Sequence, residues 1–139
     1  MEAKSTKHVT ILWADDDPDD RHIICDIVEG MSSHYRVKEV QNGRQVLDYL
    51  HAAAQSSELP CLVVLDINMP VLNGTDTLAI LKSDDTFKDL TVAVFTTSSS
   101  ERDRLMCRRF GVPMLTKPQL FSEFQKVVSQ ILQLCSQDT

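Results

Sequence analysis

The sequence predicts an α/β protein built on a five-stranded parallel sheet with helices on both faces. Short apolar runs alternate along the chain with segments whose apolar residues recur every three or four positions. This is the pattern of buried strands alternating with amphipathic helices. The run at 61–65 is apolar without alternation, as expected of a central strand covered on both faces. Right-handed crossovers between consecutive parallel strands then distribute the helices over the two faces.

The first strand and helix are predicted within residues 9–31. An apolar run at Val9–Ala14 indicates a buried strand. Asp17 and Pro18 then begin a helix, because an Asp side chain caps the free N–H groups and Pro at the first helical position has its φ already fixed. Gly30 marks the end of this helix. Its apolar side consists of Ile23, Ile24, Ile27, Val28 and Met31.

The second strand is expected at an edge of the sheet, and the third at its centre. Residues 35–40 mix polar and apolar side chains, which indicates a half-exposed edge strand. Asn42 and Gly43 supply a turn into a helix that contains Val46, Leu47 and Leu50. The central strand at 61–65 is followed by a loop at 68–74 with Pro and Gly, which leads into a third helix through Leu78 and Leu81.

The last two strands are predicted at 90–95 and 112–116, each followed by a helix. A helix is expected between these two strands. Ser98 and Glu101 have the spacing of a capping box for its start, and Gly111 ends it. The apolar residues of that helix are Leu105, Met106 and Phe110. The final amphipathic helix runs from about Phe121 to Leu134.

Length and charge limit the classes of protein to consider. A chain of 139 residues, 42% of them hydrophobic, suits one domain, so we expect a single unit over 1–139 with its core at about 8–135. A net charge of -6 and a pI near 5.1 argue against binding to nucleic acid or to an anionic membrane. The chain has neither an apolar run of about 18 residues nor a secretory signal pattern, so we expect a cytoplasmic protein.

The cysteines and histidines are dispersed along the chain. No C-x-x-C pair and no H-x-x-x-H pair occurs. The cysteines are therefore predicted to be small core residues, not a disulfide or zinc framework, and the histidines do not indicate a transition-metal site. These residues are Cys25, Cys61, Cys107 and Cys135, and His8, His22, His34 and His51.

Polar residues that can carry chemistry follow four of the five strands. Asp15 and Asp16 follow the first strand, Asp66 the third, Thr96 the fourth and Lys117 the fifth. Because the carboxyl ends of parallel strands meet at one edge of the sheet, these side chains are expected to converge there. Taken singly, each has an ordinary explanation, since a strand often ends on Thr and Lys-Pro often forms a turn. The coincidence at corresponding strand ends favours a shared site.

The converging groups suit phosphoryl transfer to a carboxylate. Carboxylates about 5 Å apart repel one another unless a cation joins them, and Mg²⁺ prefers oxygen ligands from one or two carboxylates together with a phosphate. A carboxylate beside the cation can attack phosphorus and form an aspartyl phosphate. Thr96 could donate a hydrogen bond to the phosphoryl group and Lys117 could neutralise it. Asp66 is the predicted acceptor.

With these motifs, the chain resembles a response-regulator receiver domain of the CheY-like family from two-component signalling, over essentially its whole length. The acidic pair after the first strand and the separations of 30 residues from Asp66 to Thr96 and 21 from Thr96 to Lys117 all match. The resemblance implies a doubly wound (βα)5 flavodoxin-like fold with strand order 2-1-3-4-5. The Asp-Asp-Asp-Pro-Asp-Asp segment at 15–20 also resembles stand-alone receivers, including those paired with bacterial phytochromes.

The resemblance also implies roles for single residues. Asp66 is the phosphoacceptor, and Thr96 is the switch hydroxyl. Lys117 completes the catalytic set and precedes a cis Pro118. The expected Mg²⁺ ligands are Asp15, Asp16, Asp66 and the main-chain carbonyl of Asn68. The implied phosphoryl donor is a sensor histidine kinase or a histidine phosphotransfer protein, and a further protein is expected to bind the switched surface. Such a receiver catalyses its own phosphorylation and slow dephosphorylation but is not a turnover enzyme.

One residue departs from the family pattern and leaves alternatives open. Met114 stands where the family usually has Tyr or Phe, a ring that changes orientation on phosphorylation. Met114 is either a switch residue or a plain core residue, and the second reading favours a phosphorylation-independent, pseudoreceiver-like binding module. A haloacid dehalogenase type of phosphatase also forms an aspartyl phosphate. It requires a second Asp two residues after the nucleophile, where this chain has Asn68.

Overall fold

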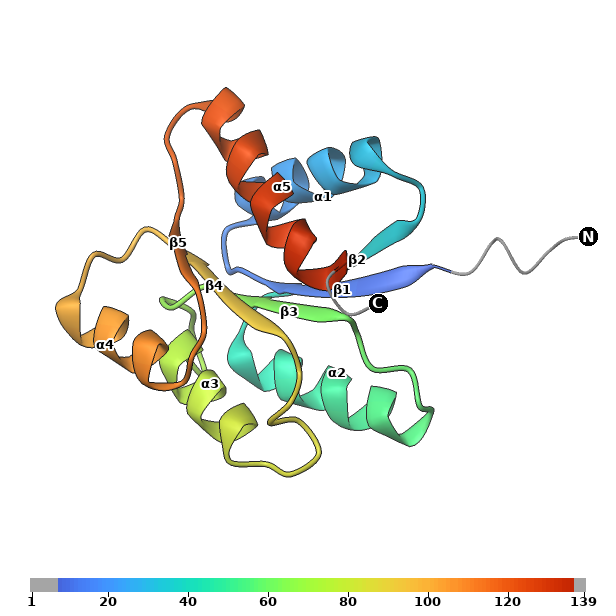
Figure 1. Cartoon of the computed structure of the whole chain (residues 1–139), viewed down its shortest axis with the longest axis vertical. Coiled ribbons are helices and arrows are strands. Elements are labelled where there is room, and N and C mark those ends of the chain that lie inside the picture. Colours follow the sequence, from blue (N-terminus) through green and yellow to red (C-terminus); the bar gives the residue numbers. More distant parts are fainter. Residues whose placement is uncertain (1–7, 137–139) are drawn as a thin grey trace, which may run out of the picture.

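The computed structural model describes residues 8–136, and its five strands form one parallel sheet in the predicted order β2-β1-β3-β4-β5 (Figure 1). In both pairs that β1 forms, Ala14 is the last paired residue, opposite Val40 of β2 and Leu65 of β3. These strands therefore end level with one another. The strands are β1 (Val9–Ala14), β2 (Tyr35–Val40), β3 (Leu62–Leu65), β4 (Val92–Thr96) and β5 (Met114–Thr116).

Helices cover both faces of the sheet. Helices α1 (Pro18–Met31) and α5 (Phe121–Ser136) lie on one face, and α2 (Gly43–Gln55), α3 (Gly74–Lys82) and α4 (Glu101–Arg109) lie on the other (Figure 1). Alternate strand residues enter two separate apolar clusters. The cluster under α1 and α5 contains Ile11, Trp13, Val64 and Phe95, and the cluster under α2, α3 and α4 contains Leu12, Ala14, Val63, Leu65 and Val94. The sheet therefore divides the interior into two cores.

Side-chain caps begin the first four helices. Asp17 caps α1 as predicted, accepting hydrogen bonds from the N–H groups of Asp19 and Asp20. The predicted capping box of Ser98 and Glu101 is wrong, because α4 begins later and its cap is Ser100, which accepts from the N–H of Asp103. Asn42 and Asn73 cap α2 and α3.

Two residues assigned to apolar helix faces lie at the surface instead. Met31, the last residue of α1, is 47% exposed, and Leu105 of α4 is 51% exposed. Met31 lies in the last turn of α1, beyond the buried residues Ile24, Ile27 and Val28. Helix α4 buries only Cys107, and six of its nine residues are charged.

The prediction that no cysteine forms a disulfide is wrong. Cys61 and Cys135 are disulfide-bonded, with their Cα atoms 5.5 Å apart. Their separation of 74 residues along the chain hid the pair, because only the fold brings them together. Cys107 is a buried free thiol as predicted, and Cys25 is a half-buried one.

The Lys117-Pro118 peptide bond also differs from expectation. No cis peptide bond occurs in the part of the chain that the structure describes, so this bond is trans. The trans isomer is the lower in energy for most X-Pro bonds, by about 0.5–1 kcal/mol. Between residues 8 and 136, no helix has the length and apolar character that a membrane crossing requires.

Candidate functional site

The sheet register places two carboxylates side by side at its carboxyl edge. The N–H of Asp15 donates to the carbonyl of Val40 at 3.1 Å, and the N–H of Asp66 donates to the carbonyl of Ala14 at 3.0 Å. These bonds extend the β2-β1-β3 pairing by one residue beyond the strands. As a result, carboxylate oxygens of Asp15, Asp16 and Asp66 all lie within 4.8 Å of one another. Asp15 and Asp66 are buried and Asp16 is exposed.

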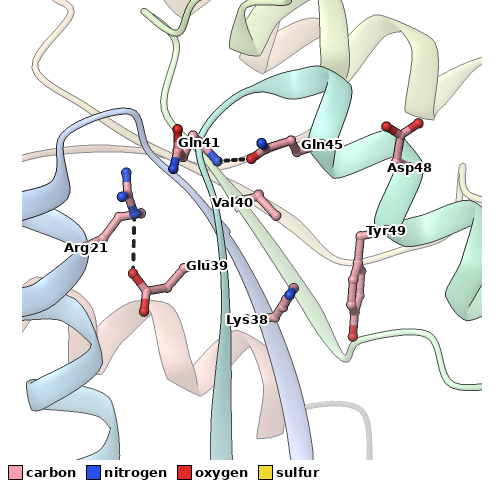
Figure 2. Close-up of a pocket in the computed structure, with 8 residues that line it drawn as sticks. All are labelled: Arg21, Lys38, Glu39, Val40, Gln41, Gln45, Asp48 and Tyr49. Carbon is pink, nitrogen blue, oxygen red and sulfur yellow. Dashed lines mark hydrogen bonds and ion pairs between the residues drawn. The ribbon is translucent and has the colours of Figure 1, made fainter.

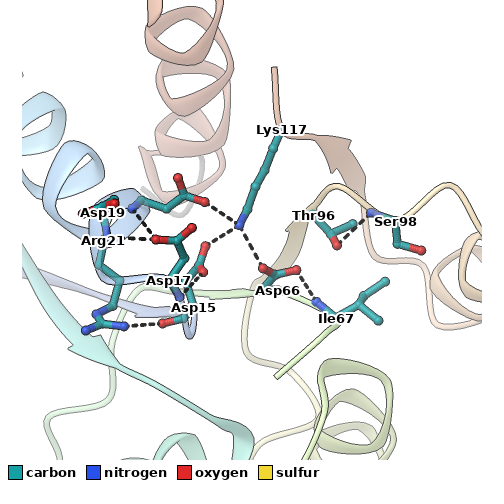
Figure 3. A network of polar contacts seen from close by, with 10 residues as sticks. Asp15, Asp17, Asp19, Arg21, Asp66, Ile67, Thr96, Ser98 and Lys117 are labelled. Carbon is teal, nitrogen blue, oxygen red and sulfur yellow. Dashed lines mark hydrogen bonds and ion pairs between the residues drawn. The ribbon is translucent and has the colours of Figure 1, made fainter. Parts of the chain in front are cut away.

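Lys117 enters this cluster from the end of β5. Its N–H donates to the carbonyl of Thr96 at 2.9 Å, which fixes the start of the side chain beside β4. Its Nζ lies 2.6 Å from Asp15 Oδ2 and 2.9 Å from Asp66 Oδ2 (Figure 3). It also lies 2.9 Å from Asp20 Oδ2. The side chain is only 7% exposed. One buried ammonium thus joins three carboxylates from two loops and a helix.

Asp20 is a site residue that the sequence reading missed. It lies in the first turn of α1, three residues after the cap Asp17, and its side chain is 25% exposed. The signal was the second Asp pair of the segment at 15–20. Because Asp17 and Pro18 begin the helix, Asp20 falls in its first turn, which directly follows the carboxyl end of the first strand.

The loop after Asp66 holds this residue in place. The N–H of Ile67 donates to Asp66 Oδ1 at 2.6 Å, and the N–H of Gly74 donates to the Ile67 carbonyl at 2.8 Å. A Cβ at Gly74 would collide with the Asp66 carbonyl oxygen and lie 2.8 Å from Ile67 Cα. Glycine is therefore required here so that α3 can begin against the backbone of Asp66.

The other predicted residues lie around the same edge. Thr96 ends β4, is fully buried, and accepts a hydrogen bond on Oγ1 from the N–H of Ser98 at 3.2 Å (Figure 3). Asn68 is exposed in the loop after Asp66. Met114 is half-buried, pairs with Val94 across β4 and β5, and packs against the cluster under α2, α3 and α4.

Arg21 of α1 anchors the backbone of the acidic loop. Its Nη1 donates to the Asp15 carbonyl at 2.7 Å, and its Nε pairs with Glu39 of β2 at 3.3 Å. The N–H of Asp17 donates to Asp15 Oδ1 at 3.0 Å, which orients that carboxylate.

Arg21 and Glu39 also border a hollow of about 610 Å³ between β2 and α2 (Figure 2). This hollow includes none of the predicted site residues.

The charges in the site do not balance. Burial raises the pKa of Asp15 to about 6, and the contact with Lys117 opposes this shift without cancelling it. Burial lowers the pKa of Lys117, but its bonds to Asp15, Asp66 and Asp20 outweigh burial and raise it overall. The carboxylates of these three residues and of Asp16 therefore surround a single permanent ammonium, and the site keeps an excess of negative charge.

The donor set fits a hard divalent cation. Asp15 Oδ2 is buried and forms an ion pair with Lys117 but no hydrogen bond of acceptable geometry, so it retains unused acceptor capacity. Asp15, Asp16 and Asp66 present only oxygen ligands, and these converge closely enough to share one ion. The exposed Asp16 leaves the site open to solvent on one side.

The fold and this edge define a doubly wound α/β protein with an acidic, lysine-bearing site at the carboxyl ends of its strands. The family model of the response regulator receiver domain matches residues 11–129. The chain therefore belongs to the response regulator receiver domain family.

Solved receivers share the whole fold. The phosphorylated cyanobacterial phytochrome response regulator RcpA has a TM-score of 0.85 and 27% identity, covering 95% of this chain and 96% of that one. The Mn(2+)-bound form of response regulator Rcp1 has a TM-score of 0.79 and 26% identity, covering 88% of this chain and 91% of that one. The comparison by sequence also finds response regulator Rcp1 of Synechocystis sp..

Proteins matched by sequence have a comparable identity to this chain. A probable methanogenesis regulatory protein, FilR2 of Methanothrix harundinacea, is 29% identical over 124 residues, covering 87% of this chain and 79% of that protein. Several further relatives are longer, and the chain spans between 25% and 52% of their length. The receiver is the part that these proteins have in common with this chain.

Proposed function

We propose that this receiver accepts a phosphoryl group on Asp66 from the phosphohistidine of a sensor histidine kinase or a histidine phosphotransfer protein, in a Mg²⁺-dependent reaction. One observation carries the proposal: Asp66 forms an ion pair with Lys117 within a cluster of convergent carboxylates at the carboxyl edge of the sheet. An isolated aspartate at a strand end would need neither the buried ammonium nor the second carboxylate.

In the transfer, an oxygen of Asp66 attacks phosphorus while the bond from phosphorus to the histidine nitrogen breaks, and that nitrogen keeps the bonding electron pair. Ile67 holds Asp66 Oδ1 through its N–H, which fixes the orientation of the carboxylate. The Lys117 ammonium, 2.9 Å from Asp66 Oδ2, is placed to neutralise charge on the phosphoryl oxygens. Thr96 Oγ1 accepts from Ser98, which leaves the hydroxyl proton free to be donated to the phosphoryl group.

Asp15, Asp16 and Asp66 would hold the Mg²⁺, together with the main-chain carbonyl of Asn68. The bound ion would offset the repulsion between the carboxylates and the incoming phosphoryl group. The position of Asp15 is fixed within this chain, because the N–H of Asp17 orients its carboxylate and Arg21 holds its carbonyl.

Thr96 and Met114 are the proposed switch residues. Thr96 is buried and its bond to Ser98 leads directly toward α4, so a movement of the hydroxyl toward a phosphoryl group alters the β4–α4 loop. Met114 lies on β5 beside this segment and packs against the core below α4. Its unbranched thioether can repack when the loop moves. A downstream protein would recognise the altered surface.

The proposal also covers the partners of the protein and the compartment in which it acts. The protein acts as a phosphoacceptor and not as a turnover enzyme, and its partners are proteins instead of nucleic acid or membrane. It functions in the cytoplasm as a single receiver over 1–139. The acidic net charge of -6 supports this choice of partners.

Intact-protein mass after incubation with acetyl phosphate or phosphoramidate tests the proposal. The native chain should gain one phosphoryl group with Mg²⁺ and none with a chelator. Asp66→Asn should gain none, while Asp48→Asn, a control at an exposed carboxylate of α2, should behave as the native chain does. Hydroxylamine should remove the added mass, because it cleaves acyl phosphates.

Failure of every donor to modify the native chain would contradict the phosphoacceptor role. Phosphorylation of Asp66→Asn to the native extent would place the acceptor elsewhere. The pseudoreceiver-like alternative predicts partner binding without any added mass, but the presence of all the acidic ligands and Lys117 gives it no support.

A further inference from the structure

The Cys61–Cys135 disulfide takes no part in the phosphoacceptor site. Cys61 directly precedes β3, and Cys135 lies in the last turn of α5, which Figure 1 shows beside the start of that strand. Their Cα separation of 5.5 Å is in the range that a disulfide requires. Asp66 follows β3 at its opposite end, roughly 16 Å away at about 3.3 Å per residue. The bridge therefore has its own location and its own chemistry.

The two bridged cysteine residues differ in their exposure to solvent. Cys135 is 6% exposed and belongs to the apolar cluster beneath α1 and α5. Cys61 is half-buried and borders a hollow of about 620 Å³, whose wall also includes His8, His34 and Glu58. A small thiol or disulfide entering this hollow therefore meets Cys61 before it meets Cys135.

We propose that Cys61 and Cys135 are a reversible redox-modification site that exchanges with low-molecular-weight thiols and disulfides of the glutathione class. In the oxidising direction, the Cys61 thiolate attacks one sulfur of the small disulfide and releases one small thiolate. The Cys135 thiol then loses its proton and attacks the Cys61 sulfur, releasing the second small thiolate. Two protein thiols are oxidised, and one small disulfide is reduced to two thiols.

The reducing direction uses the same entrance. A small thiolate attacks Cys61, the bond to Cys135 breaks, and the Cys135 sulfur leaves as a thiolate that takes up a proton. A second small thiolate then removes the first one from Cys61 as a small disulfide. Because Cys135 leaves into an apolar cluster, where a thiolate is poorly stabilised, we expect this step to be slow.

The other two cysteines serve as internal references. Cys107 is 1% exposed in the opposite cluster, under α4, and has no route to the bridge. Cys25 lies on α1, and burial together with Glu39 raises the pKa of its thiol to about 12, so its thiolate is scarce near neutral pH. Both should remain free thiols under mild oxidants.

The bridge controls how firmly the end of α5 is attached. Val128, Ile131 and Leu132 of α5 are buried in the cluster through apolar contacts of their own, which do not involve the bridge. Reduction therefore leaves the helix packed but removes the only covalent tie between its last turn and the sheet in the described part of the chain. We expect the reduced protein to stay folded, with faster hydrogen exchange confined mainly to this last turn.

The experiment equilibrates the full chain in mixtures of reduced and oxidised glutathione without denaturant, followed by acid quench. Free thiols are then blocked with N-ethylmaleimide in denaturant, and masses are measured on the whole chain and on its peptides. The expected result is two blocked thiols in oxidising mixtures and four in reducing ones, with the change confined to Cys61 and Cys135. The same end states should be reached from either direction.

Thermal unfolding provides a second measurement. The oxidised chain should melt about 10 °C above the reduced chain, because the bridge closes a long loop. Cys135→Ala should abolish the dependence of melting on redox state, and Cys25→Ala should preserve it. If Cys135→Ala does not fold, Cys61→Ser at the half-buried position replaces it.

Three outcomes would overturn the proposal. Four free thiols in every mixture would mean that the pair does not oxidise under mild conditions. Two free thiols in every mixture, with reduction only after denaturant is added, would mean a permanent structural crosslink. Glutathione attached to Cys61 with Cys135 left free would mean modification without the bridge.

Discussion

Replacing Lys117 by Met keeps most of the side-chain volume and removes the ammonium that lies 2.6 to 2.9 Å from three carboxylates. Lys117 is 7% exposed, so solvent screens these contacts little. Removal of one partner from a buried ion pair costs about 3–5 kcal/mol, because the remaining charge stays buried. We expect a loss near the lower figure, since the 25% exposed Asp20 can be solvated. That loss corresponds to a melting temperature lower by roughly 10 °C.

The loss should depend on pH in a defined direction. Burial already raises the pKa of Asp15 to about 6, and the loss of Lys117 removes the contact that opposes burial, so this pKa rises further. A carboxyl group whose pKa is raised by folding contributes stability at low pH and loses that contribution as pH rises through the folded value. The raised pKa of Lys117 contributes stability at every pH below the ordinary lysine value of 10.5. This contribution is therefore the same at pH 5 and at pH 8. Lys117→Met should therefore be more destabilised at pH 8 than at pH 5.

Urea unfolding followed through the fluorescence of Trp13, the single and fully buried tryptophan, measures the free energy at both pH values. The unfolding buffer contains a chelator, because a bound divalent ion would partly replace the lost ammonium. Lys126→Met is the control, because this lysine is 71% exposed and its pair with Glu123 is a surface one, so the change should stay below about 0.5 kcal/mol. A loss below about 1 kcal/mol for Lys117→Met, or an equal loss at both pH values, would refute the reasoning.

Three further predictions concern the metal site and the loop after Asp66. Affinity for Mg²⁺, measured by isothermal titration calorimetry, should fall about tenfold between pH 7.5 and pH 5, because a proton competes for Asp15 below its pKa of about 6; equal affinity at both pH values would count against Asp15 as a ligand. Val71 is 80% exposed and has a φ of 68°, in the left-handed region. Asn tolerates this region better than Val, so Val71→Asn should stabilise the chain by about 1 kcal/mol in urea unfolding. Val71→Ala should stabilise it less. Gly74→Ala should destabilise the chain by at least about 2 kcal/mol in urea unfolding, because the new Cβ meets the Asp66 backbone. Gly30→Ala is the control: nothing lies near a Cβ at this position in α1, so the substitution should stabilise the chain by about 0.5–1 kcal/mol. Equal effects of the two substitutions would contradict the packing argument.

Local chemistry specified much of this protein before any tertiary structure was considered. Uninterrupted apolar runs identified the buried strands, and Asp17-Pro18 placed the start of α1. The polar residues at the strand ends could be assigned to one edge, because parallel strands all point their carboxyl ends the same way. The order of strands required more than these patterns, and it was predicted through resemblance to a known family. The start of α4 was misplaced because Ser98 and Ser100 both offer a cap within two residues of each other.

Contacts between distant segments were decided only in the folded chain. Asp20 joins Lys117 across 97 residues, and Cys61 joins Cys135 across 74. Neither pair has a local signal, because their proximity follows from strand order and from the packing of α1 and α5 on the sheet. The raised pKa of Asp15 has the same origin, since burial in the assembled edge is its main cause. Residue type and spacing thus determined which chemistry is possible in this chain, and the packing of the sheet and helices decided which groups meet and how strongly they are charged.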